Sequence, residues 1–250
     1  MTLRVDLNCD LGEGYAFDEA LLDGITSANI ACGFHAGGPG VMRRTVELAL
    51  KKGVALGAHP GLRDLEGFGR RAMNVEPQEA FDLTLYQIGA LQSFATLHGA
   101  RLVHVKPHGA LYTMAARDAA LADALAAAVR AADPKLVFVG LAGSEMIRAA
   151  RRLGLPAAEE AFVDRAYQSD GTLVPRGQPG ALIDASEDAA RRAVRLVKEG
   201  KVAAHGGGEV SIRADTLCIH GDTPGAPEHL RALREALIRE GIELRRFGTP

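Results

Sequence analysis

The segment Val54-Ala-Leu-Gly-Ala-His59 is an apolar, strand-like run that ends in a histidine and continues into a turn with proline and glycine. The same form recurs in Asn29-Ile-Ala-Cys-Gly-Phe-His35, Leu102-Val-His-Val-Lys-Pro-His108 and Leu217-Cys-Ile-His220. A fifth segment, Val5-Asp-Leu-Asn-Cys-Asp-Leu-Gly-Glu13, carries carboxylates in place of the imidazole. Such runs predict short buried strands, each followed by a polar side chain at its C-terminal end.

Helical patterns separate the strand-like runs. Strands are expected at about 3–8, 28–32, 54–58, 101–106, 135–141, 159–163 and 215–220, and helices at about 39–52, 77–98, 117–132, 143–153, 186–199 and 226–240. Strict alternation implies parallel strands joined by right-handed crossovers. The number of units and the length of 250 residues favour a barrel over an open sheet. We expect one α/β domain over residues 1–250, a (β/α) barrel of seven or eight parallel strands.

A barrel of this kind brings the C-terminal ends of all its strands to one face, where α/β barrels keep their chemistry. The polar side chains that follow the strands are therefore expected in one pocket: Asp10, Glu13, His35, His59, Lys106, His108, His220 and Asp222. The other histidines lack this context and are assigned to structure or solvent: His98, His104, His205 and His229.

Composition narrows the class of protein. The chain is 47% hydrophobic and 24% charged, with a net charge of −2 and no long run of one sign, so nothing indicates a nucleic-acid or membrane-surface partner. No apolar run approaches the length of a membrane span. Cys9, Cys32 and Cys218 are far apart, which favours reduced thiols and a cytoplasmic location.

Several pocket residues have a plainer alternative role. Glu13 could cap a short helix near 18–24. Lys106 could neutralise a phosphate or carboxylate, or simply pair with a neighbouring Asp or Glu. Asp222 could orient His220, act as a base or begin a helix. The Gly-rich turn from Gly33 to Gly40 could bind an anion at the start of a helix, or could be a tight turn that needs positive φ.

Imidazoles together with Asp10 suit Zn²⁺ or a similar divalent ion with an open position for water. No His-x-x-x-His pair or comparable spacing supports a metal directly. The segment 164–182 contains glycine and proline and reads as a long loop, of the kind that often forms a functional lid.

The chain resembles the LamB/YcsF family over nearly its whole length. The resemblance rests on a series of motifs in order: Asp6-Leu-Asn-Cys-Asp-Leu-Gly-Glu13, Ser27-Ala-Asn-Ile-Ala-Cys-Gly-Phe-His-Ala-Gly37, Gly57-Ala-His-Pro-Gly61, Gly67-Phe-Gly-Arg-Arg71, Val105-Lys-Pro-His-Gly-Ala-Leu-Tyr112, Asp164-Arg-Ala-Tyr167 and Cys218-Ile-His-Gly-Asp-Thr-Pro224. One departure is Gly38, where an acidic residue is usual.

The resemblance implies a barrel related to the glycoside hydrolase/deacetylase group. It also implies ATP-dependent opening of 5-oxoproline to glutamate by a protein that works with two partner subunits, B and C. Phosphorylation of the amide oxygen, water addition and ring opening form a sensible route, which needs phosphate-binding donors, a base and a proton donor. On this basis the catalytic candidates are Asp10, Glu13, Lys106, His108, His220 and Asp222. The candidates for binding ATP or phosphate are Gly33, His35, Gly37, Arg70, Arg165 and Arg176.

The related deacetylases place one Asp and two His on a metal, and the equivalents by position are Asp10, His59 and His108. Mg²⁺ with ATP, or a Zn-like ion at this cluster, is the expected metal. Two other functions stay open: a stand-alone metal-dependent hydrolase or deacetylase acting on carbohydrate or amide substrates, and a non-catalytic protein that binds a small acidic metabolite.

Overall fold

The strands close into a barrel. The structure is a computed structural model that describes residues 3–183, 186–221 and 225–247. Neighbouring strands pair in parallel around the ring, and the last pairs back onto the first. In ring order the strands are β1 (Arg4–Leu11), β2 (Ser27–Ala31), β3 (Ala55–His59), β4 (His104–Val105), β5 (Val137–Leu141), β6 (Ala157–Phe162) and β9 (Thr216–Ile219). The predicted (β/α) barrel is confirmed, with seven strands in the closed ring.

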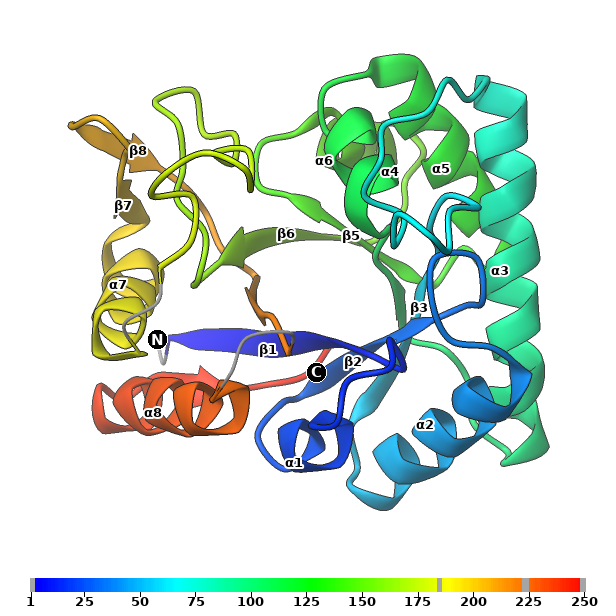
Figure 1. Cartoon of the computed structure of the whole chain (residues 1–250), viewed down its shortest axis with the longest axis horizontal. Helices are drawn as coiled ribbons and strands as arrows, with labels where there is room; N and C mark the ends of the chain where they lie inside the picture. The colour runs from blue at the N-terminus through cyan, green and yellow to red at the C-terminus, as the bar shows by residue number, and fades with distance from the viewer. Residues whose placement is uncertain (1–2, 184–185, 222–224, 248–250) are drawn as a thin grey trace.

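Helices surround the barrel (Figure 1). They are α1 (Asp18–Leu22), α2 (Pro39–Lys51), α3 (Pro77–Leu97), α4 (Gly109–Ala115), α5 (Ala119–Ala132), α6 (Glu145–Arg152), α7 (Ser186–Glu199) and α8 (Ala226–Arg239). The six helices expected from hydrophobic periodicity begin and end within two residues of the expected positions. Helix α4 was not predicted, because its seven residues are too few to show a repeated apolar face.

Three short strands lie outside the ring and were also not predicted. Strand β10 (Glu243–Leu244) pairs with the start of β1. Strands β7 (Lys201–Ala203) and β8 (Glu209–Ser211) form an antiparallel hairpin, which projects at the upper left of Figure 1. Segments of two or three residues carry too little alternation to be recognised in a sequence.

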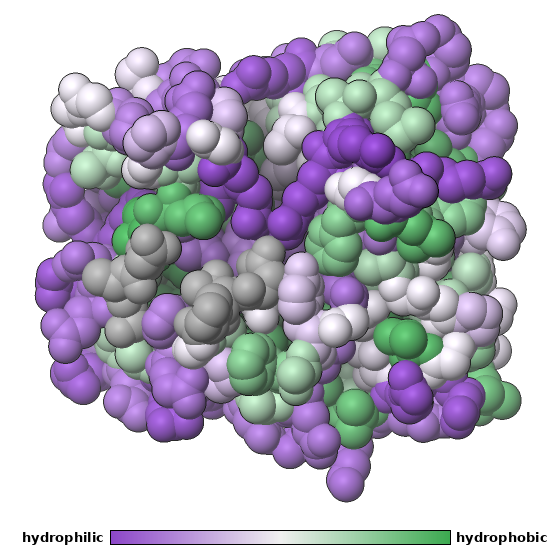
Figure 2. All heavy atoms as spheres, viewed as in Figure 1, coloured by the Kyte–Doolittle hydropathy of each residue, from purple (hydrophilic) through white to green (hydrophobic). Residues whose placement is uncertain are grey.

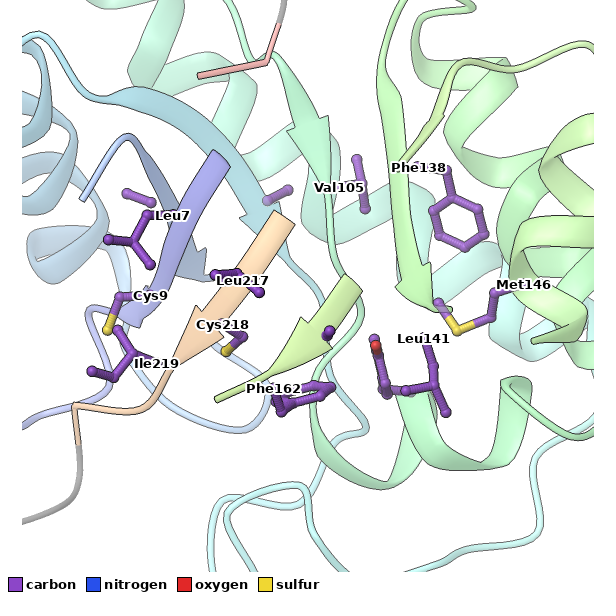
Figure 3. Packing of buried hydrophobic residues seen from close by; sticks show 14 of the residues in the cluster. Leu7, Cys9, Val105, Phe138, Leu141, Met146, Phe162, Leu217, Cys218 and Ile219 are labelled. Atoms are coloured by element: carbon purple, nitrogen blue, oxygen red, sulfur yellow. The ribbon is translucent and has the colours of Figure 1, made fainter. Parts of the chain in front are cut away.

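The outer face of the barrel carries the apolar core. Leu7 and Cys9 of β1 lie beside Leu217 and Ile219 of β9 in Figure 3, and all are buried. Helix residues such as Leu21 complete this layer. Alternate residues of a strand point to opposite faces, so the same strands present their polar residues to the barrel interior.

The barrel interior is polar, whereas branched apolar side chains fill most barrels of this class. Its buried residues form one hydrogen-bonded set: Asp6, Asn8, Asp10, Ser27, Asn29, His104, Lys106, Glu160 and Thr216. At the bottom, Asp6 accepts hydrogen bonds from Thr26 at 2.7 Å and Thr216 at 2.6 Å. Burial raises the pKa of Asp6 to about 6, although these hydroxyls oppose the shift.

A second layer of amides lies above Asp6. Asn8 donates through Nδ2 to Thr216 Oγ1 at 2.7 Å and to Glu160 Oε1 at 3.0 Å. Asn29 donates to Asn8 Oδ1 at 2.7 Å, and its own oxygen contacts His104 Nε2 at 2.8 Å. The assignment of His104 to a structural role agrees with these contacts. Each of these buried amide groups gains a partner, so its desolvation is offset.

The surface seen in Figure 2 is mostly hydrophilic, with apolar side chains in small groups. Over residues 3–183, 186–221 and 225–247, we find no helix that combines the length and the apolar character needed to cross a membrane.

The packing of His104 makes a testable prediction. A Cβ on Gly57 would lie 2.0 Å from His104 Nε2, so Gly57→Ala forces His104 away from Asn29. We expect the free energy of unfolding to fall by about 1–3 kcal/mol, measured by urea denaturation. Gly89 in α3 is the matched control, because a Cβ there meets nothing within 4 Å. Gly89→Ala should raise the free energy of unfolding by about 0.5–1 kcal/mol, and equal effects at both positions would contradict the account.

Candidate active site

A cavity of about 550 Å³ opens at the C-terminal ends of the barrel strands. Residues at strand ends supply part of its wall: Asp10, His59, Lys106, His108, Phe162 and His220. Arginines and apolar side chains supply more: Arg70, Arg117, Arg165, Arg176, Met114, Leu141 and Leu173. The structure therefore brings most of the predicted pocket residues to one cavity. Asp222 lies outside the described residues.

Lys106 occupies the centre of the barrel, directly below the cavity. Its Nζ lies 3.0 Å from Asp10 Oδ1 and 2.9 Å from Glu160 Oε1, and it donates to Asn8 Oδ1 at 3.2 Å. Burial alone would lower the pKa of Lys106, but Asp10 and Glu160 hold it well above its usual value. The pairing with neighbouring carboxylates that was considered for this lysine is observed, and Lys106 also lines the cavity.

Asp10 is held in its ionised form. Burial alone would raise the pKa of Asp10, but the charges of His59 and Lys106 outweigh burial and keep it well below its usual range. Asn29 donates to Oδ1 at 2.8 Å, and His59 Nε2 lies 3.3 Å from Oδ2. An ionised carboxylate that lines a cavity can accept a proton from a bound ligand or water.

Glu13 lies under three imidazoles. Its Oε1 lies 3.1 Å from His35 Nε2, 3.2 Å from His108 Nδ1 and 3.6 Å from His59 Nε2. The capping role considered for Glu13 is not observed, because Phe17 precedes α1 and it has no side-chain cap. Burial opposes ionisation, but hydrogen bonds from His108 and His35 lower the pKa of Glu13 to about 2.

Backbone carbonyls fix the orientation of two of these imidazoles. His59 Nδ1 contacts the Lys106 carbonyl oxygen at 2.6 Å, and His108 Nε2 contacts the Phe68 carbonyl oxygen at 2.8 Å. Each carbonyl requires a proton on the nitrogen that faces it. The opposite nitrogens, His59 Nε2 and His108 Nδ1, lie 2.9 Å apart beside Asp10 and Glu13. They present lone pairs to a metal ion once the protons that these carboxylates favour are released.

Glycines leave room for this packing. A Cβ on Gly61 would lie 2.5 Å from His35 Nδ1, and one on Gly69 would lie 2.7 Å from His35 Cβ. His35 stacks on His108 with ring centroids 3.7 Å apart. Phe68, with φ of +54°, adopts a left-handed conformation rare for a bulky residue, next to the carbonyl that meets His108.

The four side chains Glu13, His35, His59 and His108 could hold a metal ion, because their ligand atoms all lie within 4.8 Å of one another. A tetrahedral zinc site with bonds of about 2.0–2.1 Å separates its ligand atoms by about 3.3 Å. The three distances from Glu13 Oε1 to the imidazoles and the distance between His59 and His108 run from 2.9 to 3.6 Å, close to this spacing. Burial lowers the pKa of His35 to about 4, which favours the neutral, metal-binding form.

This donor set overlaps only partly with the one expected by position. His59 and His108 belong to it, together with Glu13 and His35. Asp10 instead lies in a second group with Cys218 and His220, and it approaches the first group through His59 at 3.3 Å. The order of residues along the chain shows that they lie at the C-terminal face of the barrel. It does not show which carboxylate lies within reach of which imidazole.

Asp164 is a site residue that was not assigned from the sequence. Its Oδ2 lies 2.7 Å from His220 Nδ1 and accepts the His220 backbone N–H at 3.2 Å. The role considered for Asp222, orienting His220, is filled here by Asp164. The signal was present, because Asp164 directly follows the apolar run Ala161-Phe-Val163. Burial opposes ionisation of Asp164, but the charge of His220 lowers its pKa.

Three predicted anion-binding arginines, Arg70, Arg165 and Arg176, line the cavity. Arg165 donates to the Val174 carbonyl at 2.7 Å, and burial lowers its pKa to about 10. The loop expected over 164–182 also contributes Thr172, Leu173 and Pro175 to the wall. It is anchored by buried Tyr167, whose hydroxyl accepts the Phe162 backbone N–H at 2.8 Å.

Gly33 and Gly37, predicted to bind a cofactor, are not among the cavity-lining residues. Both have positive φ, and a Cβ on Gly37 would lie 3.0 Å from the Gly12 carbonyl oxygen. The alternative explanation, a tight turn that needs positive φ, accounts for these glycines. His35 from the same turn is not a cavity-lining residue, but it contacts Glu13 and packs against the cavity residues His59 and His108.

Known proteins similar to this chain point to one family. The model of the LamB/YcsF family matches residues 5–250. The A subunit of 5-oxoprolinase from Bordetella pertussis is 56% identical, with 98% of this chain and 99% of the relative covered. The A subunit of 5-oxoprolinase from Bacillus subtilis is 54% identical, with 96% of both covered. The crystal structure of a lactam utilization protein from Thermus thermophilus has a TM-score of 0.92 and 53% identity, covering 98% of this chain and 100% of that chain.

The ion pairs of Lys106 predict a large stability effect. Lys106→Met leaves Asp10 and Glu160 buried without their cation, so the free energy of unfolding should fall by about 3–5 kcal/mol in urea. Adding Glu160→Gln removes one uncompensated charge and should recover part of the loss. The control is Lys52→Met, because the exposed pair of Lys52 with Asp23 should contribute little to the free energy of unfolding. A loss at Lys106 no larger than at Lys52 would show that the central ion pairs are not needed.

Proposed function

The chain belongs to the LamB/YcsF family, and on that premise we propose that it is the A subunit of an ATP-dependent 5-oxoprolinase. The complex opens the lactam ring of 5-oxoproline to L-glutamate in the cytoplasm, and subunits B and C are its other components. The observation that carries the proposal is the cavity, which combines an ionised Asp10 and a buried Lys106 with the arginines of its wall.

The cavity suits a small, anionic, partly apolar ligand. Its volume of about 550 Å³ lies in the range of small-molecule sites. The arginines of the wall can bind the carboxylate of 5-oxoproline and a phosphoryl group. Phe162 and Leu141 offer apolar surface for the ring methylenes. All of these groups face one space at the strand ends, so a single ligand can contact them together.

ATP drives a reaction that is unfavourable without it. Transfer of a phosphoryl group to the amide oxygen makes the ring carbon electrophilic, and the arginines hold the added charge. Asp10 accepts a proton from the attacking water, and Lys106 stabilises negative charge that develops beside it. The carbon–nitrogen bond then breaks, and the acyl phosphate that results is hydrolysed to glutamate and phosphate.

A metal is part of the proposal. The residues Glu13, His35, His59 and His108 would hold a divalent, zinc-like ion, and Mg²⁺ would accompany ATP. A bound ion at the histidine cluster supplies Lewis-acid polarisation of an oxygen ligand. The protein contributes the orientation of His59 and His108 through the carbonyls of Lys106 and Phe68.

Reconstitution tests the reaction. With ATP and subunits B and C, the chain should form glutamate from 5-oxoproline, whereas the chain alone should not. Asp10→Asn should lower the rate by at least about 100-fold, because the amide cannot accept a proton, while His98→Gln, outside the cavity, should keep it. A complete mixture that leaves 5-oxoproline untouched would refute the proposal. Hydrolysis of acetylated sugars by the chain alone, without ATP, would support a stand-alone hydrolase instead.

Elemental analysis of the purified chain tests the metal. About one equivalent of a zinc-like ion is expected after dialysis against that metal. Glu13→Gln and His108→Ala should each weaken binding by at least about 100-fold in equilibrium dialysis, since a missing ligand costs more than a missing outer contact. His98→Ala is the control. If the metal content falls in His98→Ala but not in Glu13→Gln or His108→Ala, the histidine cluster is not the metal site.

A further inference from the structure

His220 provides a second chemical centre in the same cavity. It follows β9, whereas His59 ends β3, and β1 and β2 separate these two strands in the ring. Both histidines line the cavity, so a ligand bound there can contact both. Opening a lactam needs a base for water and an acid for the leaving nitrogen. Asp10 and His220 both line the cavity, so one ligand can reach a carboxylate and an imidazole.

The ring of His220 is held in a fixed orientation. Its Nδ1 lies 2.7 Å from Asp164 Oδ2, and the same oxygen accepts the His220 backbone N–H at 3.2 Å. The face of the imidazole stacks on Phe162, with centroids 5.6 Å apart and planes 15° from parallel. A side chain held by its backbone, one nitrogen and one face is pre-organised, which is what a proton donor in a reaction requires.

The carboxylate of Asp164 interacts with the ring of His220 through one oxygen, Oδ2. Its other oxygen, Oδ1, is buried and has no hydrogen-bond partner within the part of the chain that the structure describes. An ionised carboxylate beside Nδ1 keeps the proton on that nitrogen. Nε2 is therefore the position where this ring gains or loses a proton. Arg176 adds a positive charge near Asp164 and also favours the carboxylate form, which lowers the pKa of Asp164 further.

The remaining charged groups near His220 do not offer a transferable proton. Asp10 is ionised, and burial raises the pKa of the Cys218 thiol well above its usual value. Lys106 is held by Asp10 and Glu160.

The other imidazoles and the tyrosine of the cavity wall are also committed. The protons of His59 Nδ1 and His108 Nε2 are directed at backbone carbonyls, and their other nitrogens face the carboxylates of Asp10 and Glu13. The Tyr112 hydroxyl donates to Glu160 at 2.8 Å. Among these described residues of the cavity wall, His220 is thus the one whose Nε2 is placed to exchange a proton with a bound ligand.

We propose that His220 is the catalytic acid that protonates the ring nitrogen as the lactam opens, and that Asp164 is its positioning residue. The inference rests on the proposed 5-oxoprolinase function. As the carbon–nitrogen bond breaks, its electron pair goes to nitrogen and the proton on His220 Nε2 forms the new N–H bond. The ring of His220 is left neutral and regains a proton from solvent. Water supplies the oxygen added to the ring carbon, and its proton goes to Asp10.

The pH dependence of kcat tests this assignment, with subunits B and C in excess so that this chain limits the rate. A catalytic acid must be protonated, so the wild-type rate should fall on the alkaline side. His220→Gln should lower kcat by at least about 100-fold and abolish the alkaline limb, with KM changed much less. Retention of that limb in His220→Gln, or loss of the acid limb instead, would overturn the assignment.

Asp164→Asn tests the positioning role while the imidazole remains. Loss of the carboxylate charge should move the alkaline limb to lower pH and lower kcat by about 10-fold or more at neutral pH. An unchanged limb together with lower stability in urea would show a merely structural role and overturn it. His98→Gln should match the wild type throughout. If the wild-type complex forms no glutamate, the proposed function fails; if it does and His220→Gln keeps the alkaline limb, only this inference fails.

Discussion

The buried ammonium of Lys106 is the interaction on which the site depends. It lies between Asp10 and Glu160 at the centre of the barrel, where two carboxylates without a cation would repel each other in a medium of low polarity. Asn8 and Asn29 complete the hydrogen bonds of these groups from below. Because the same lysine is a wall of the cavity, the network that holds the interior together also fixes the charge of Asp10.

The fold could be predicted because its signal is periodic, and the polar strand ends could be predicted because parallel strands share one face. The polar interior of the barrel could not be predicted in this way. The alternation of Asp6, Asn8 and Asp10 with apolar residues looks like a strand with one face in water, and only ring closure places that polar face inside. Asn29 and Glu160 acquire their roles from partners far apart in sequence.

The sequence also could not show which of the polar side chains contact one another. Spacing placed His220 at the cavity but could not show that Asp164, 56 residues earlier, holds its Nδ1. Glu13 was weighed as a helix cap, yet the fold turns it toward imidazoles from three other strand ends. Gly37 was predicted to be part of an anion site, but its close approach to the Gly12 carbonyl oxygen is enough to explain why a glycine stands at this position. The sequence shows which reactive side chains the chain carries, and closure of the barrel decides which of them come into contact.

The division of the cavity into two centres follows from ring order. The histidine cluster comes from the ends of β2, β3 and β4, with Glu13 from the end of β1. Asp164 and His220 follow β6 and β9, and Asp10 of β1 lies between the two groups. A ligand over Asp10 therefore has proton-accepting carboxylate beneath it and imidazoles on two sides. The nitrogen of an amide is a poor leaving group unless it gains a proton while the carbonyl carbon gains an oxygen. Asp10 of β1 and His220, which follows the neighbouring strand β9, both line the cavity and can perform these two transfers on one ring.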